Sequence, residues 1–134
     1  MLQKIADTGL LIAGLDPRDQ HHDWAIRVFE REEPPWLVCE PVLHEASTNI
    51  RTPEPLLEML SIGDLKVAFQ LEENIREVLA LIRKYRDQEM DLADASVVRM
   101  SELFEDCRVY TVDRTDFSVY RRYSRRPIPC AFPE

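Results

Sequence analysis

Carboxylates occupy four positions from which they could build a metal-dependent reaction site. Asp7 closes the apolar segment "QKIA", and Asp113 follows the apolar segment "VYTV". Glu45 lies in "PVLHEAS" and Asp94 lies in "MDLADAS". Hard divalent ions such as Mg²⁺ and Mn²⁺ take oxygen ligands of this kind. A bound ion can lower the pKa of a water molecule and stabilise charge on a phosphoryl oxygen, which suggests metal-assisted phosphodiester hydrolysis.

Such a site requires a fold that brings distant acids together. Ligands of open parallel sheets bind beyond the carboxyl ends of the strands, and Asp7 and Asp113 would each close a strand there. Short apolar segments alternate along the chain with segments of helical periodicity, which indicates parallel crossovers. We therefore expect an α/β fold with a mostly parallel central sheet flanked by helices. Acids gathered at its edge would repel one another strongly without a cation.

The individual elements follow from the apolar patterns. Strands are predicted at "QKIAD", "WLVC", "CRVYTV" and, as a last short one, "PIPCAF", whereas "LKVAF" is either a strand or an ordered connection. Helices are predicted from Thr8, from a cap at Asp19, from Glu40–Pro41 and from about Leu92. A short helix carries Leu56, Leu57 and Leu60, and a long one carries Ile75, Val78, Leu79, Ile82 and Tyr85.

Other interpretations of the same residues remain open. Asp7 and Asp94 could each be a helix-terminal acid favoured by the macrodipole, and Asp113 could be a turn residue. Asp7-Thr8-Gly9 is also the tripeptide of aspartic proteases, but these need two such loops in a β-rich chain. His44-Glu45 begins an H-E-x-x-H zinc motif, but Thr48 stands where the second histidine is required.

The composition is that of one soluble globular domain spanning residues 1–134. Of its residues, 45% are hydrophobic and 31% are charged, and no apolar run approaches the ~20 residues that cross a bilayer. The apolar N-terminal stretch is interrupted by Asp7, so we expect no secretory signal. Cys39, Cys107 and Cys130 lack C-x-x-C spacing, which favours unpaired thiols in a reducing cytoplasm.

The net charge of −8 argues against a general nucleic-acid-binding surface. A basic C-terminal strip is the exception, and it leaves an anionic partner possible there. Its guanidinium groups suit phosphate geometry, so we expect either contacts with an RNA backbone or a solvated tail. The arginines concerned are Arg121, Arg122, Arg125 and Arg126.

Four motifs in order carry a resemblance to a known family. The segments "ADTGLLIAGLDPRDQHHDWA", "VLHEAS", "MDLADASVVRMSE" and "VYTVDRTDF" resemble a PIN-domain ribonuclease, specifically the VapC-type toxin of a bacterial type II toxin–antitoxin system. The resemblance covers the chain from Lys4 to about Ile128. It implies a PIN-like three-layer sandwich and an endoribonuclease that depends on Mg²⁺ or Mn²⁺.

The resemblance also implies roles and partners. It assigns metal-binding and catalytic roles to Asp7, Glu45, Asp94 and Asp113, and auxiliary positions to Thr8, Thr111, Asp91 and Asp116. Gly9 departs from the many relatives that carry Ser there. The expected partners are an RNA substrate, a cognate antitoxin whose C-terminal segment binds near the site, and a second copy in a homodimer. The alternative is a catalytically silent PIN-like module that binds RNA or protein.

Overall fold

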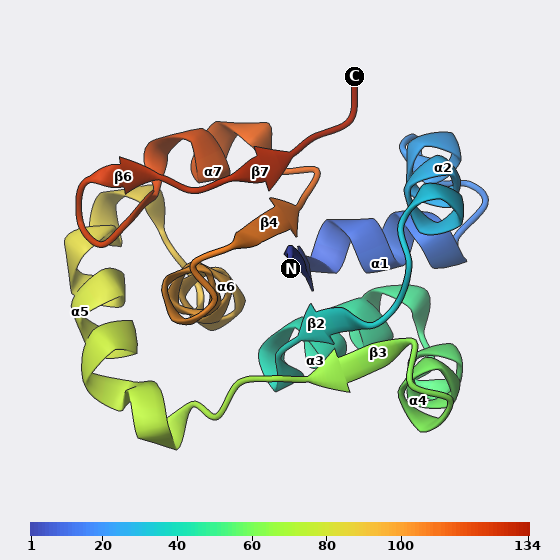
Figure 1. The fold of residues 1–134 in the computed structure, drawn as a ribbon, viewed down its shortest axis with the longest axis horizontal. Coiled ribbons are helices and arrows are strands. Elements are labelled where there is room, and N and C mark those ends of the chain that lie inside the picture. The colour runs from blue at the N-terminus through green and yellow to red at the C-terminus, as the bar shows by residue number, and fades with distance from the viewer.

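A five-stranded parallel sheet forms the centre of the molecule. The computed structural model describes all residues 1–134, and its sheet has the order β3-β2-β1-β4-β7 (Figure 1). The strands are β1 (Gln3–Ala6), β2 (Trp36–Val38), β3 (Leu65–Val67), β4 (Cys107–Tyr110) and β7 (Cys130–Ala131). Every pair of neighbours is parallel. The predicted α/β class with a parallel sheet is thus confirmed, and the ambiguous segment "LKVAF" contains edge strand β3.

Helices flank the sheet in an arrangement compatible with a three-layer sandwich. They are α1 (Thr8–Leu15), α2 (His22–Arg31), α3 (Glu40–Ile50), α4 (Glu54–Ser61), α5 (Ile75–Lys84), α6 (Leu92–Leu103) and α7 (Arg114–Val119). Short 3₁₀ turns cover Glu72–Asn74 and Arg86–Gln88, and a separate antiparallel hairpin joins β5 (Arg121–Arg122) to β6 (Arg126–Pro127). No helix has the length and apolar character needed to cross a membrane.

Strand β1 lies at the point where the order of the sheet reverses. The chain proceeds from β1 to β2 and β3 on one side, and later adds β4 and β7 on the other. Crevices form beyond the carboxyl ends of the strands at such a switch point. Ala6 is in register with Tyr110, and the Asp7 amide donates to the Tyr110 carbonyl at 3.1 Å. The residues that follow β1 and β4, Asp7 and Thr111, therefore lie side by side.

The apolar core confirms most of the predicted stripes but corrects one of them. On α5, Val78 and Leu81 are buried, whereas Ile75 and Leu79 are 52% and 43% exposed. The helix packs against α6 with one face only, and that face is set by the spacing of Val78, Leu81 and Tyr85. Ile82, also in the predicted stripe, is partly buried against the core, so only Ile75 and Leu79 lie toward solvent.

Two local features differ from the sequence prediction. Asp19 does not cap α2 directly: the helix begins at His22, and the Asp19 carboxylate instead accepts from the His21 amide at 2.8 Å. The β5–β6 hairpin was not expected, because its turn lacks the Gly or Asn that normally marks one. Tyr123 and Ser124 take the left-handed backbone conformation there, with φ of 54° and 65°.

Candidate metal centre

An acidic cavity of about 510 Å³ opens where β1 and β4 end. It brings together all four carboxylates that were predicted as metal ligands, together with both auxiliary acids. Its acidic lining residues are Asp7, Glu45, Glu89, Asp91, Asp94, Asp113 and Asp116. No Lys, Arg or His lines the cavity, so nothing in its wall offsets the negative charge.

Asp7 is held at the end of β1 by a neighbouring threonine. Its side chain is buried, and its Oδ2 accepts a 2.6 Å hydrogen bond from the Thr111 hydroxyl. The same hydroxyl oxygen accepts from the Asp113 amide at 3.0 Å, which ties the two strand ends together. Burial raises the pKa of Asp7 to about 6, although the Thr111 hydrogen bond opposes the rise; Glu45 and Asp113 add to it by charge repulsion.

Asp94 lies in the first turn of α6. Asp91 caps this helix, since its carboxylate accepts from the Asp94 amide at 2.8 Å. The Asp94 carboxylate itself accepts a 2.8 Å hydrogen bond from the Tyr120 hydroxyl. Partial burial, followed by repulsion from Asp91, raises the pKa of Asp94 to about 7. Both perturbed acids thus gain protons easily in the absence of a cation.

Asp113 and Asp116 lie at the start of α7. Asp113 caps the helix by accepting from the Asp116 amide at 2.9 Å. Partial burial and the neighbouring Asp113 raise the pKa of Asp116. Carboxylate oxygens of Asp94, Asp113 and Asp116 all lie within 4.8 Å of one another, close enough to share one ion. Asp116, expected to be auxiliary, therefore belongs to the closest cluster.

Asp7 and Glu45 line the cavity outside that closest cluster. Thr8 lies beside them, and its buried hydroxyl oxygen has no hydrogen-bond partner. An orphaned buried hydroxyl costs about 1–3 kcal/mol unless something at the site satisfies it. Clustered carboxylates with an unpartnered hydroxyl are the donor set that a partly hydrated Mg²⁺ or Mn²⁺ would use. The residues present therefore fit such an ion.

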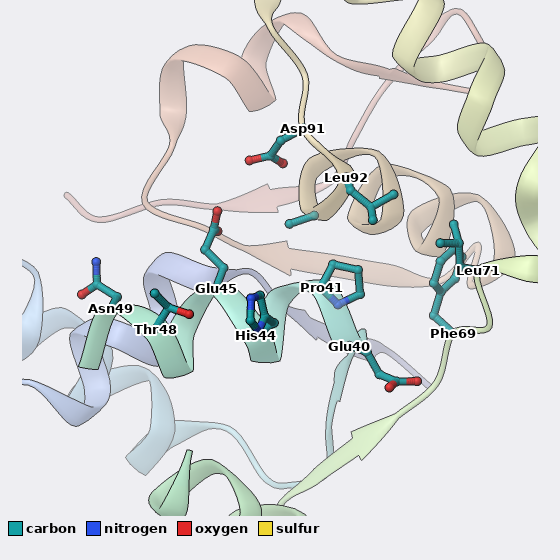
Figure 2. A pocket seen from close by; sticks show the side chains of 11 residues that line it. Glu40, Pro41, His44, Glu45, Thr48, Asn49, Phe69, Leu71, Asp91 and Leu92 are labelled. Atoms are coloured by element: carbon teal, nitrogen blue, oxygen red, sulfur yellow. The ribbon is translucent and has the colours of Figure 1, made fainter. Parts of the chain in front are cut away.

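A wider groove of about 820 Å³ adjoins the acidic cavity. The two share Glu45, Asn49 and Asp91. In Figure 2, Phe69 and Leu71 lie on one side of the groove and Thr48 and Asn49 on the other, with Glu45 and Asp91 between them. The sequence did not predict this groove, because Phe69 and Leu71 follow β3 in a segment without a recognisable motif.

Two of the predicted RNA-binding arginines have structural partners. Arg122 is only 8% exposed, and its guanidinium donates to the carbonyls of Ser101 and Glu105 at 3.0 and 2.9 Å. Arg121 donates to carbonyls at the end of α7. These hydrogen bonds join the hairpin to the end of α6 and leave little of Arg122 exposed, and a contact of Arg122 with an RNA backbone stays a prediction.

The other two predicted arginines, Arg125 and Arg126, are exposed. Arg126 lies 3.7 Å from the Glu105 carboxylate. Neither lines the acidic cavity. Two cationic side chains that the sequence did not single out, Arg18 and Arg51, line a hollow that shares Asn49 with the cavity. Their positions depend on two loops and show no pattern in the sequence.

The fold and the cavity define an α/β protein with an acidic site at the carboxyl edge of a parallel sheet. No family model matches the chain, and no curated protein matches it.

Gly9 provides a test of how tightly the site is packed. A Cβ at this position would collide with the side chain of Val112, which precedes Asp113. We expect Gly9→Ser to lower the free energy of unfolding by roughly 1–3 kcal/mol in urea denaturation, because overpacking is destabilising. The loss should be smaller when Gly9→Ser is introduced into a Val112→Ala background. An equal loss in both backgrounds would show that Val112 is not the obstacle.

Proposed function

We propose that the protein is a Mg²⁺- or Mn²⁺-dependent endoribonuclease with a PIN-like fold, the toxin of a toxin–antitoxin pair. The observation that carries the proposal is the approach of Asp94, Asp113 and Asp116 to within 4.8 Å. Asp7 and Glu45 line the same cavity, at the switch point of the sheet. The resemblance of the four sequence motifs to VapC-type toxins supplies the substrate class.

The roles of the residues follow from their positions. Asp94, Asp113 and Asp116 would hold the ion, with Asp7 or Glu45 available to complete its shell. An ion bound there would supply an acidified water and would neutralise charge on the phosphoryl oxygens. Asp7 and Glu45 can also orient the attacking water by accepting its protons in hydrogen bonds. Attack by the water opposite the leaving oxygen would form one P–O bond and break another. The leaving oxygen takes up a proton, so the RNA chain is cut into two fragments, one ending in a phosphate and the other in a hydroxyl.

The RNA backbone itself needs positive charge near the cavity. Arg18 and Arg51, which line the hollow joined to the cavity through Asn49, are in a position to supply it. Guanidinium groups bind phosphate oxygens in bidentate geometry. Arg18, whose Nε lies 3.2 Å from the Asp16 carboxylate, and Arg51 therefore join the exposed Arg125 and Arg126 as candidate backbone contacts.

Partners can be proposed from the surfaces that remain. The groove beside the cavity combines apolar side chains with Glu40, Glu45 and Asp91, and it contains no Lys or Arg. It suits a segment of an antitoxin that is both apolar and basic. Ile75 and Leu79, exposed on α5, are compatible with a homodimer contact.

The test is a cleavage assay on total RNA with mapped cut sites. The protein is first treated with a chelator and then assayed with and without Mn²⁺. We expect discrete internal cuts that require the ion, together with a higher Tm in its presence. Ion-induced stabilisation without cleavage would favour the alternative of a silent RNA- or protein-binding module. If Mn²⁺ produces no cleavage and no rise in Tm, the proposed metal centre is contradicted.

A further inference from the structure

We infer that Tyr120 is a positioning residue of the proposed metal centre. Its hydroxyl holds the Asp94 carboxylate close to those of Asp113 and Asp116. This inference rests on the proposed function and adds a residue that the four motifs do not contain. Tyr120 follows α7 immediately, outside the segment "VYTVDRTDF".

Tyr120 is held by one hydrogen bond and by packing against two aromatic rings. Its side chain is fully buried, and its hydroxyl lies 2.8 Å from the Asp94 Oδ2. Its ring makes edge-to-face contacts with Tyr85, at 5.0 Å between ring centroids, and with Phe117, at 5.2 Å. The Tyr85 hydroxyl in turn accepts from the Arg121 amide at 2.8 Å. A rigid aromatic group thus presents a single hydroxyl to the carboxylate.

The Tyr120–Asp94 hydrogen bond connects the two helices that carry the acids of the cluster. Asp113 and Asp116 lie at the start of α7, Tyr120 caps its end, and Asp94 belongs to α6. Few residues of α6 and α7 approach each other directly. The Tyr120–Asp94 hydrogen bond joins α6 to the residue that ends α7. It helps to fix the separation of the carboxylates that would share an ion.

The same hydrogen bond determines which oxygen of the Asp94 carboxylate is free to bind an ion. One carboxylate oxygen accepts from the phenol, and the other oxygen receives no protein hydrogen bond, so it is available to an ion. Without the phenol, the carboxylate can rotate away and a buried acceptor loses its partner. Partners of this kind typically change metal affinity by about 10- to 100-fold. A positioning role therefore predicts a loss of metal affinity with the fold retained.

The experiment compares Tyr120→Phe with Tyr85→Phe. Each variant loses one hydroxyl from the same aromatic group, but only Tyr120 contacts an acid of the site. After chelation, Mn²⁺ is titrated while Tm and RNA cleavage are followed. For Tyr120→Phe we expect the half-saturating Mn²⁺ concentration to rise about 10- to 100-fold. Cleavage at saturating Mn²⁺ should approach that of the wild type. Tyr85→Phe should leave the half-saturation unchanged even where it lowers Tm.

The outcomes separate this inference from the proposed function. If the wild type responds to Mn²⁺ but both variants titrate alike, Tyr120 is only a packing residue and the inference is overturned. If Mn²⁺ changes neither the Tm nor the RNA cleavage of the wild type, both the proposed metal centre and the inference about Tyr120 are refuted. If Tyr120→Phe does not fold, Phe117→Leu is used instead, because it loosens the packing of Tyr120 but keeps the Tyr120 hydroxyl. We then expect Phe117→Leu to raise the half-saturating Mn²⁺ concentration. An unchanged half-saturating concentration would overturn the inference.

Discussion

The Asp94→Asn variant should lose metal-dependent RNA cleavage by roughly 10²- to 10³-fold under single-turnover conditions. The substitution removes the charge of one of the three closest carboxylates, and an ion contributes several kcal/mol of transition-state stabilisation. Asparagine has the same size and can still accept the hydrogen bond from Tyr120. The loss should therefore come from weaker binding and activation of the ion rather than from misfolding.

A stability measurement makes this prediction more specific. With a chelator present, Asp94→Asn should be at least as stable as the wild type, because burial and repulsion penalise the charged form of Asp94. With Mn²⁺, the variant should gain less in Tm than the wild type does. Asp106→Asn is the matched control, since Asp106 is 70% exposed and lies outside the cavity. Cleavage by Asp94→Asn equal to that of the control would refute the assignment.

The gathering of the acids could be predicted from the sequence because it depends on simple topology. Asp7 and Asp113 each follow an apolar strand, and parallel neighbours end at the same edge of a sheet. The register of Ala6 with Tyr110 then brings the two strand ends together without any further information. Asp94 follows from the helical pattern around it, which places its carboxylate in the first turn of α6.

The role of Asp116 could not be predicted in the same way. It depends on α7, a helix of six residues, which is too short to show an apolar stripe. The turn of chain capped by Asp113 brings Asp116 back toward Asp94. The partnership of Tyr120 with Asp94 joins residues 26 positions apart. Contacts of this kind depend on how two short elements pack, and no local pattern in the sequence specifies them.

The arginines show a different limit of sequence reasoning. The density of Arg in the C-terminal strip indicates positive charge but not the direction of each side chain. The backbone carbonyls of Ser101 and Glu105 needed a donor, and Arg122 supplies it. A buried guanidinium that satisfies carbonyls looks the same in sequence as an exposed one that awaits a phosphate. Only the packing of the hairpin on α6 distinguishes the two.

The metal-free protein should lose stability as pH rises from about 4 to about 7. The pKa of Asp7 is raised from 3.8 to about 6, so in this range the folded state holds more protons than the unfolded state. The free energy of unfolding then falls with pH, and Asp7 contributes roughly 3 kcal/mol to the fall. Asp94, with its pKa raised to about 7, acts in the same direction. Its contribution is reduced by solvent screening, since it is only partly buried.

Asp7→Asn isolates this contribution. An amide at position 7 can still accept the hydrogen bond from Thr111, but it does not titrate. In chelator, urea unfolding of the two proteins should give similar stabilities near pH 4. By pH 8, Asp7→Asn should be the more stable by up to roughly 3 kcal/mol. Parallel stability curves for the two proteins would show that burial does not perturb Asp7.

Mn²⁺ should reverse the sign of the pH dependence for the wild type. Ligands must be deprotonated to bind, so the stabilisation by a fixed Mn²⁺ concentration grows as pH rises through the pKa values of Asp7 and Asp94. An acid cluster without a metal function would lose stability with pH whether or not Mn²⁺ is present. A metal centre predicts opposite slopes, because burial and mutual repulsion destabilise the charged carboxylates of the ion-free cavity, whereas a bound cation stabilises the same charged forms.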